Sequence, residues 1–355
     1  MNFDENSLEL MTIDMLREQG YDYLAGEDIL RDYHDVILED RLFTSLQKIN
    51  PTLQESTIQE AVRQIKNLSQ NNVIRNNKEF SRFLHGGVPV SEYTFENGTT
   101  NTSVHLIDYE NVENNDFLVV NQFTIIEHSE KRPDVIVFIN GLPLIVFELK
   151  SMTREDVDLE DGYRQLKNYM NNHIPSLFYY NQFLIVSDGA TAKAGTITCN
   201  YQRFNEWKKT SITDEAVNHN THEPLIRGMM SKEVVLDLIR NFILFQDDAK
   251  ILPAYHQYYG VKKAIERTLK TTDGRAGVIW HTQGSGKSFS MVFYAGNMIA
   301  KMNNPTIIVV TDRNDLDNQL FETFAKCQDF LRQKPIQIES RKDLIEKLED
   351  KRAGG

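Results

Sequence analysis

Hydrophobic residues follow two patterns between residues 7 and 245 of this 355-residue chain. Some recur every three or four positions, which predicts amphipathic helices, and others form short runs bounded by turn residues, which predict strands. The helical pattern covers residues 7–20, 27–50, 51–68, 156–172 and 232–245. The strand pattern covers residues 93–95, 104–109, 116–127, 135–140, 144–149, 178–187 and 191–207. This mixture predicts an α/β fold for this part of the chain.

The clearest pair of predicted strands lies in the stretch Arg132–Lys150, RPDVIVFINGLPLIVFELK. Val135–Asn140 is rich in β-branched residues, and Leu144–Leu149 is a second apolar run. Between them stands Asn140-Gly141, which is typical of a tight hairpin turn. The stretch therefore predicts a β-hairpin.

Charged residues stand at the ends of these two strands. Asp134 enters the first strand, and Glu148 and Lys150 close the second with one residue between them. Residues two apart in a strand face the same side, so Glu148 and Lys150 project together, and the hairpin brings Asp134 back beside them. Two carboxylates and an ammonium at the rim of an apolar sheet are costly unless something compensates them. A divalent metal ion would do so.

This arrangement fits hydrolysis of a phosphodiester by metal-bound water. Asp134 and Glu148 would hold Mg²⁺, which would lower the pKa of a water molecule, while Lys150 would orient that water or stabilise the developing negative charge. Glu9, on the first predicted helix, is a candidate to complete the acidic cluster. The alternative is a salt bridge at a strand edge, because Glu-x-Lys is common on solvated strands. The metal site is favoured because these acidic residues end apolar strands instead of alternating along a wet face.

Gln165 and Tyr169 lie on the predicted helix that follows the hairpin. Their spacing of four residues places them on one helix face. They are either ordinary polar residues of a helix surface, or they contact DNA or support the acidic site. The second interpretation depends on the acidic site being real.

The pattern changes after residue 254. It predicts, in order, a helix with Val261 and Ile265, the strand Ala276–Trp280, the loop HTQGSGKS, the helix Phe289–Lys301, the strand Thr306–Val310 and the charged helix Arg341–Arg352. A β-loop-α-β unit of this kind is typical of a parallel sheet with crossover helices.

The loop between the first of these strands and its helix predicts a phosphate-binding site. Gly284 and Gly286 allow backbone amides to face phosphates, Lys287 would reach the β- and γ-phosphates, and Ser288 would ligate Mg²⁺. His281 stands where the strict pattern has its first glycine, so a chance Gly-Ser-Gly-Lys-Ser loop is the alternative. The nucleotide-binding candidates are Gln257, His281, Thr282, Gln283, Gly284, Ser285, Gly286, Lys287 and Ser288.

Weaker signals have mostly ordinary explanations. Gln257 is a candidate for reading an adenine edge, and Asp312–Gln319 is either a helix cap or a DNA-contacting loop. His219 and His222 have no further ligand nearby, which favours solvated loop positions. Basic residues that either contact DNA phosphates or form solvated surfaces are Lys208, Lys209, Lys262, Lys263, Arg267 and Lys270.

Composition narrows the class of protein. The formal net charge of −12 argues against binding DNA over the whole surface, so any contact must come from a local basic channel. No apolar run approaches the roughly 18 residues of a membrane span, and no signal peptide is recognisable. The two cysteines are far apart and have no neighbouring ligands, which argues against a zinc site. We therefore expect a cytoplasmic protein with no membrane contact.

Taken together, these motifs resemble the N-terminal part of the endonuclease, or R, subunit of type I restriction enzymes, over nearly the whole chain. Asp134, Glu148 and Lys150 correspond to that family's PD-(D/E)xK nuclease triad. Glu9 matches the acidic residue of the first helix, and Gln165 with Tyr169 matches the QxxxY motif after the triad. The stretches QLKNYMNNHIPSLFYYNQFLIVSDG and WHTQGSGKS look specific to the family.

The second half resembles the beginning of a superfamily 2 helicase. Gln257 looks like the adenine-sensing glutamine, DRNDLDNQ resembles motif Ia, and the family's own loop tolerates a residue other than glycine at the position of His281. No DEAD- or DEAH-like box follows Ile307–Val310, so only part of the motor is expected.

The resemblance implies a particular fold and domain order. We expect a PD-(D/E)xK restriction-endonuclease-like domain at residues 1–228, a helical connector at 229–253, and the start of a RecA-like ATPase domain at 254–355. The implied enzyme is an ATP-dependent type I site-specific deoxyribonuclease that cuts unmodified double-stranded DNA, with Mg²⁺ and ATP as cofactors. Its implied partners are a methyltransferase (M) and a specificity (S) subunit. Two alternatives stay open: a DNA-repair nuclease-helicase without a methyltransferase, and a truncated, non-catalytic DNA-binding or assembly fragment.

Overall fold

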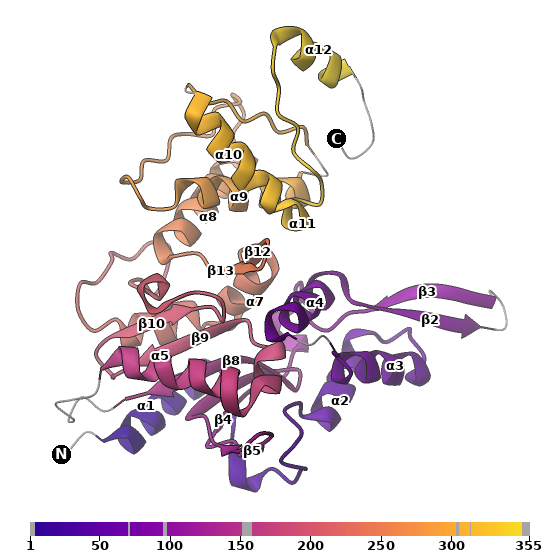
Figure 1. Cartoon of the computed structure of the whole chain (residues 1–355), viewed down its shortest axis with the longest axis vertical. Coiled ribbons are helices and arrows are strands. Elements are labelled where there is room, and N and C mark those ends of the chain that lie inside the picture. Colours follow the sequence, from indigo (N-terminus) through magenta and orange to yellow (C-terminus); the bar gives the residue numbers. More distant parts are fainter. Residues whose placement is uncertain are drawn as a thin grey trace. The chain divides into compact units, whose positions relative to one another are not determined.

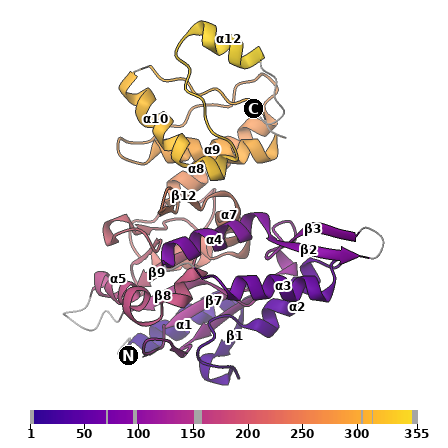
Figure 2. The same ribbon diagram turned by 45° about the vertical axis from the view of Figure 1, so that its right-hand side comes forward.

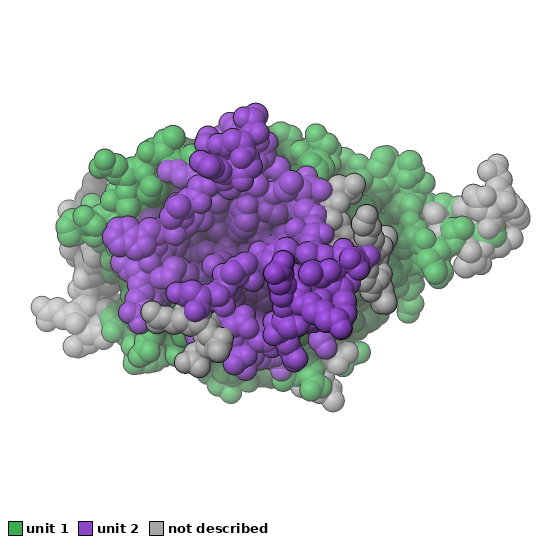
Figure 3. All heavy atoms as spheres, turned by 90° about the horizontal axis from the view of Figure 1, so that it is seen from above, with its two compact units in different colours: residues 1–240 green, residues 241–355 purple. Residues whose placement is uncertain are grey.

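The structure is a computed structural model, and it describes residues 4–69, 72–94, 98–150, 158–302, 305–312 and 314–349. The chain forms two compact units, Met1–Arg240 and Asn241–Gly355, which Figure 3 distinguishes by colour. Together they have the mixed α/β character that the sequence predicts. Within the described ranges, no helix has both the length and the apolar character needed to cross a lipid bilayer.

A seven-stranded mixed sheet organises the first unit (Figure 1). In spatial order its strands are β1 (Asp22–Ala25), β4 (Phe117–Asn121), β7 (Val135–Ile139), β8 (Leu142–Leu149), β9 (Phe183–Ser187), β10 (Ala192–Gly195) and β11 (Asn205–Glu206). The neighbours β4, β7 and β8 are antiparallel, whereas β1 pairs with β4, and β9 with β8, in parallel. Every side chain of β7 and β8 is buried, so both faces of the sheet centre are covered.

Helices surround this sheet. They are α1 (Glu5–Glu18), α2 (Glu39–Ile49), α3 (Glu55–Lys66), α4 (Val73–Gly86), α5 (Leu159–Asn168), α6 (His222–Pro224) and α7 (Lys232–Asn241), with π-helical turns η3 (Tyr169–His173) and η6 (Leu225–Met229). Shorter 3₁₀ turns are η1 (Gly26–Asp28), η2 (Val112–Asn114), η4 (Pro175–Tyr179) and η5 (Tyr201–Arg203). The helix α1 contacts β1, β4 and β8, while α5 contacts β8 and β9 and lies in front of them in Figure 1.

Two small hairpins stand apart from the main sheet. The strands β2 (Val88–Thr94) and β3 (Gly98–Val104) form an antiparallel ribbon beside α3, and Figure 2 shows it extending away from the sheet. The strands β5 (Ile125–Ile126) and β6 (Glu130–Lys131) form a second, very short hairpin.

The β7–β8 hairpin confirms the prediction for residues 132–150. Asn140 and Gly141 adopt positive φ angles of 53° and 77°, which this kind of tight turn requires. The fully buried Asn140 side chain donates to the carbonyl oxygen of Leu106 at 2.8 Å and to Oδ1 of Asn115 at 2.9 Å. Turn geometry therefore sets the pairing next to the turn, and the register then shifts by one residue at a β-bulge between Val137 and Phe138.

The predicted helix over residues 27–50 is wrong in its first half, since only Glu39–Ile49 is α-helical. Backbone groups before it bond to distant segments. The N–H of Ile126 donates to the Tyr33 carbonyl oxygen, and the N–H of Leu38 donates to that of Gly141, both at 2.9 Å. A continuous helix would use these groups internally, so the tertiary bonds replace it.

Other predicted elements differ at their ends. The predicted strand over residues 104–109 is wrong, because β3 ends at Val104 and the Asn50 side chain bonds both backbone groups of His105. The helix predicted over 156–172 is α-helical to Asn168 and then π-helical, and residues 156–157 lie outside the described ranges. The helix predicted over 232–245 ends at Asn241.

The second unit is mainly helical. Its helices are α8 (Tyr255–Lys270), α9 (Lys287–Lys301), α10 (Asn314–Lys326), α11 (Gln328–Leu331) and α12 (Arg341–Glu349), and β12 (Leu244–Gln246) pairs with β13 (Ala249–Ile251). Aromatic rings form its core, with the Phe242 ring centroid 4.7 Å from that of Tyr258 and 5.6 Å from that of Phe293. The helices predicted at 289–301 and 341–352 correspond to α9 and α12.

The two strands predicted in this unit, over residues 276–280 and 306–310, are absent. Val278, Trp280 and Val310 are 95%, 92% and 83% exposed. A parallel strand obtains its backbone hydrogen bonds from neighbouring strands, and β12–β13 is the only strand pairing among the described residues of this unit. These apolar segments therefore have no sheet to join.

Candidate active site

The end of the β7–β8 hairpin brings the predicted triad together. Val135 pairs with Phe147, so Asp134 lies opposite Glu148 one position further along. The backbone N–H of Leu149 donates to Asp134 Oδ2 at 2.7 Å. Lys150 Nζ donates to Glu148 Oε1, also at 2.7 Å. The pairing of the two strands thus places both carboxyls and the ammonium together at the same end of β7 and β8.

Glu148 is wholly buried, and within the described residues no amide, ammonium or hydroxyl group donates to its second carboxyl oxygen, Oε2, while the Asp134 carboxyl lies within hydrogen-bonding reach of the Glu148 side chain. Burial, followed by the negative charge of Asp134, raises the pKa of Glu148 well above its ordinary value. Burial also raises the pKa of Asp134 to about 6, although the Leu149 N–H and the Lys150 charge oppose this rise. Two carboxyls this close cannot both ionise cheaply without a further cation.

Lys150 supplies part of the compensating charge. Burial lowers the pKa of its ammonium, but the Coulomb attraction and hydrogen bond of Glu148 outweigh this effect, and the pKa stays above its ordinary value. The lysine is therefore protonated at neutral pH. The Lys150 ammonium donates to Oε1 of Glu148 and not to Oε2. The oxygen Oε2 is therefore available to ligate a metal ion.

The donor set fits Mg²⁺. Carboxylate oxygens are its preferred protein ligands, and it commonly binds one or two carboxylates while keeping several waters. Across the described ranges, no group of three or more His, Cys, Asp and Glu side chains has metal-binding geometry. The protein would therefore offer the oxygens of Asp134 and Glu148, and water or a substrate phosphate would complete the coordination.

Glu9 faces this site from α1 but is held by neutral donors. Asn121 Nδ2 donates to Glu9 Oε1 at 2.6 Å, and Gln122 Nε2 donates to Oε2 at 2.7 Å. The backbone of Gln122 has a positive φ of 49°, and its N–H donates to the carbonyl oxygen of Asp134. The Glu9 charge contributes to the raised pKa of Asp134. Sequence reasoning missed Asn121 and Gln122, whose only local signal is two amides closing an apolar strand.

Gln165 and Tyr169 lie on one face of the segment that follows the hairpin, as their spacing predicted. Gln165 Nε2 donates to Tyr169 Oη at 2.6 Å. Burial, and then the charges of Glu148 and Asp134, raise the pKa of Tyr169 above its ordinary range. At Gly162 the helix α5 packs against the sheet, where a Cβ would be in ordinary van der Waals contact with the Cγ atom of Glu148, at 3.6 Å. The backbone turns π-helical directly at Tyr169, a distortion that often marks functional sites.

His222 was predicted to be a solvated loop residue, and this prediction is wrong. Its ring is 1% exposed, with Nδ1 2.7 Å from Ser187 Oγ and Nε2 3.3 Å from Thr12 Oγ1. Burial lowers its pKa to about 4, so the ring is neutral at pH 7. The network joins α1 to β9, where the Ser187 carbonyl oxygen accepts the N–H of Lys150 at 2.9 Å. His219 is exposed, as predicted.

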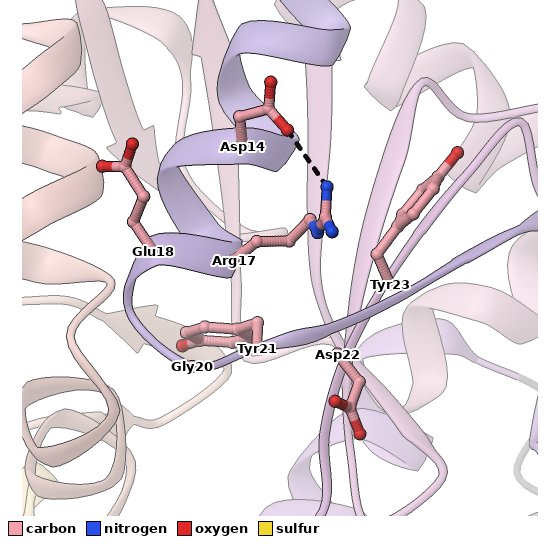
Figure 4. Close-up of a pocket in the computed structure, with 7 residues that line it drawn as sticks. All are labelled: Asp14, Arg17, Glu18, Gly20, Tyr21, Asp22 and Tyr23. Atoms are coloured by element: carbon pink, nitrogen blue, oxygen red, sulfur yellow. Dashed lines mark hydrogen bonds and ion pairs between the residues drawn. The ribbon is translucent and has the colours of Figure 1, made fainter.

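Figure 4 shows a pocket of about 740 Å³ at the end of α1, and none of the predicted site residues lines it. Three carboxylates and one guanidinium face it, with Arg17 Nη1 3.4 Å from Asp14 Oδ1. This charge does not favour a nucleic-acid phosphate. One wall is nevertheless connected to the triad region, because Tyr23 Oη donates to Asn121 Oδ1 at 3.0 Å. The lining residues are Asp14, Arg17, Glu18, Gly20, Tyr21, Asp22 and Tyr23.

The predicted phosphate loop lies at the start of α9, in the second unit. Gly284 and Gly286 have positive φ angles of 80° and 78°, which favour glycine. Lys287 Nζ donates to the carbonyl oxygens of His281 and Thr282 at 3.0 and 2.9 Å. The strand predicted before the loop is absent, so the loop is held by other contacts.

Gln257 provides one of these contacts. Its Nε2 donates to the Gly286 carbonyl oxygen at 2.9 Å, and its Oε1 accepts the N–H of Ala254 at 2.9 Å. His256 Nε2 lies 3.2 Å from the Ser285 carbonyl oxygen. The first turn of α8 therefore supports the loop. Of the stretch DRNDLDNQ, Arg313 lies outside the described residues, and Asn314 begins α10.

Comparison with known proteins identifies the family. Residues 2–203 match the family model "Type I restriction enzyme R protein N terminus", and residues 256–354 match that of the SWI2/SNF2 ATPase. The chain is 40% identical to the type I restriction enzyme HindI endonuclease subunit of Haemophilus influenzae, over 99% of this chain and 36% of that protein. It is 33% identical to the putative type I restriction enzyme MjaIXP endonuclease subunit of Methanocaldococcus jannaschii, over 90% of this chain and 34% of that protein.

A third relative, the type I restriction enzyme SauMSSORF170P endonuclease subunit of Staphylococcus aureus, is 27% identical over 91% of this chain and 33% of its own length. The chain thus spans about a third of the length of these curated relatives. The match to the R protein N terminus covers more than half of the chain. The chain therefore belongs to the family of type I restriction enzyme R proteins.

Proposed function

We propose that this chain carries the DNA-cutting site of a type I restriction enzyme, which hydrolyses phosphodiester bonds of unmodified double-stranded DNA with Mg²⁺. The observation that carries the proposal is the buried Oε2 of Glu148, to which no amide, ammonium or hydroxyl group of the described residues donates, beside Asp134 and Lys150. A salt bridge at a wet strand edge would leave both carboxyl oxygens solvated. Here burial makes the negative charge costly, and a divalent cation would remove that cost.

Each residue has a distinct role in this proposal. Asp134 and Glu148 hold Mg²⁺, whose chemistry when bound is to lower the pKa of a water and to offset phosphate charge. Lys150 keeps its proton and stabilises negative charge that develops on the phosphate. The Leu149 N–H fixes one Asp134 oxygen, which leaves the other for the metal. Glu9 adds negative charge from α1.

The second unit is proposed to be the start of an ATP-driven translocase. Lys287 donates to two carbonyl oxygens of its own loop, and phosphates would replace these acceptors when ATP binds. Ser288 would ligate the Mg²⁺ of the nucleotide, and Gln257 would contact the adenine. We assign residues 1–228 to a PD-(D/E)xK nuclease domain and 254–355 to part of a RecA-like domain. Residues 229–253, predicted to be a helical connector, contain α7 and then the β12–β13 hairpin, and we assign them to the connection between the two domains.

The proposed working form is a larger assembly. The relatives are named as endonuclease subunits, so we infer association with methyltransferase (M) and specificity (S) subunits in the cytoplasm. Translocation would need the complete subunit. A repair nuclease-helicase would instead purify without a methyltransferase, so co-purification separates these two functions.

Substitutions in the complete subunit, assembled with M and S, test the proposal. Asp134→Asn and Lys150→Ala should each abolish cleavage of unmodified DNA while ATP hydrolysis continues. Lys287→Ala should abolish ATP hydrolysis. Asp40→Asn, which removes an exposed carboxylate from the first turn of α2, is the matched control and should cut normally. Cleavage at the wild-type rate by Asp134→Asn would refute the assignment of the cutting site.

A further inference from the structure

We propose that a pocket beside the triad binds a backbone phosphate of DNA next to the one that is cut, with Lys131 as its principal cation; this rests on the proposed function. The pocket measures about 500 Å³ and lies in the first unit. It is lined by Lys131, Arg164, Gln165, Asn168 and Tyr169. No carboxylate lines it, although the chain carries a net charge of −12. Its polar groups are an ammonium, a guanidinium, two amides and a phenol, a set of donors that suits a phosphodiester.

Lys131 differs from the other cation of the pocket. Its ammonium makes no hydrogen bond or ion pair within the described residues, and its side chain is half-buried. Arg164 is already paired with Glu160 at 3.1 Å and with Asp161 at 3.0 Å, and it is 63% exposed. The negative charges of these two partners offset the guanidinium, so Lys131 provides the uncompensated charge.

The two walls of the pocket are tied together by His173. Its Nδ1 lies 2.8 Å from Ser129 Oγ, and its carbonyl oxygen accepts the N–H of His128 at 3.0 Å. Its Nε2 lies 3.1 Å from Asn168 Nδ2. These bonds hold the β5–β6 hairpin, which carries Lys131, against the end of α5 and the π-helical turn. A site preorganised in this way loses little conformational entropy when it binds an anion.

The pocket shares a residue with the triad region. Tyr169 Oη accepts the hydrogen bond from Gln165 and is therefore free to donate its own proton to an anion. The same hydroxyl lies within the electrostatic reach of Glu148 and Asp134. Lys131 ends β6 and precedes Asp134 by three residues in the sequence. A DNA strand whose scissile phosphate meets the triad would therefore bring a neighbouring phosphate towards Lys131.

Salt-dependent binding of a short DNA duplex to the full chain tests this site. Each phosphate contact contributes roughly 0.9 to the slope of log affinity against log salt, so Lys131→Ala should flatten the slope by about 0.9 and weaken binding about eightfold at 0.1 M salt. Lys131→Arg should restore both. The matched control is Lys48→Ala on α2, where the lysine donates to the Glu113 carbonyl oxygen outside the pocket. It should bind as the wild type does.

The proposal is overturned if Lys131→Ala keeps the wild-type slope and affinity, or if the wild-type chain binds no duplex. It is also overturned if Lys48→Ala loses as much duplex affinity as Lys131→Ala loses. Circular dichroism and thermal unfolding of Lys131→Ala establish that it is folded. Asp134→Asn separates the two proposals, because it should lose cleavage in the assembled enzyme and keep duplex binding. Continued cleavage by Asp134→Asn would refute the cutting site, whereas wild-type binding by Lys131→Ala would refute only the phosphate pocket.

Discussion

Replacing Asp134 with asparagine should stabilise the metal-free first unit at neutral pH while abolishing its response to Mg²⁺. Asparagine retains an oxygen that can accept the Leu149 N–H, but it carries no charge to repel Glu148. The substitution therefore separates the electrostatic cost of the acidic site from its hydrogen bonding. If the Asp134 carboxylate instead stabilised the fold through favourable interactions, its replacement by asparagine would lower the stability of the first unit.

The magnitude follows from the pKa of Asp134, which rises from 3.8 to about 6 in the folded chain. The folded state holds the proton more tightly than the unfolded state, so stability is greatest below pH 3.8 and is lost as the pH rises through 6. This rise in pKa corresponds to about 3 kcal/mol, of which roughly half is lost between pH 5 and pH 8. The stability difference between Asp134→Asn and wild type should therefore grow by roughly 1–2 kcal/mol over this interval.

Tryptophan fluorescence during denaturant unfolding, with EDTA present, measures this difference. Trp207 in the first unit is 2% exposed, and Trp280 in the second is 92% exposed, so a Trp280→Phe background makes the signal report the first unit alone. Mg²⁺ at ten times its dissociation constant should stabilise the wild type by about 1.4 kcal/mol and leave Asp134→Asn unchanged. A stability difference that does not change with pH, or an equal Mg²⁺ effect in both proteins, would refute this reasoning.

Three further predictions concern residues that support the two sites. The pKa of His222 falls from 6.5 to about 4 on folding, so the stability that its neutral ring contributes is present above pH 6.5, and about 3 kcal/mol is lost as the pH falls through 4. His222→Gln should flatten the unfolding free energy across this range, and an unchanged pH profile would contradict the assignment. Asn121→Ala removes a donor from the buried Glu9 carboxylate and should destabilise the first unit by about 1–3 kcal/mol in the same fluorescence assay, so an unchanged midpoint would count against it. Gly286→Ala would place a Cβ 2.6 Å from Nε2 of Gln257 and should weaken binding of a fluorescent ATP analogue by about tenfold or more. Gly274 has a similar φ of 73° with open space around it, so Gly274→Ala is the control. An equal loss of affinity in both variants would refute the specific contact.

Local signals in the sequence predict part of this molecule well. Asn140-Gly141 fixes the turn of the hairpin, and period-two alternation then places Glu148 and Lys150 on one side without knowledge of the rest of the fold. The bond between Asn121 and Glu9 joins residues 112 positions apart, and no local pattern indicates it.

The failed predictions all depend on long-range contacts, which are made in some cases and missing in others. Residues 27–38 have helical spacing, but the carbonyl oxygen of Tyr33 and the N–H of Leu38 bond to distant segments instead. His222 lies in a polar stretch, and only the folding of α1 and β9 around it reveals a buried network. The apolar runs at 276–280 and 306–310 meet the compositional rule for strands, yet a strand needs neighbours that composition does not provide.

The parallel pairing of β8 with β9 limits where insertions and deletions can occur in this chain. Parallel neighbours cannot be joined by a tight turn, so the connection through α5 is required by the sheet itself. That connection also carries Gln165 and Tyr169, so a deletion that removed them would break the sheet as well. Among the described residues, β2 and β3 pair only with each other, so a change in the length of the chain between them would leave the main sheet intact. Length variation among descendants of this sequence should therefore gather in the ribbon and avoid the crossover.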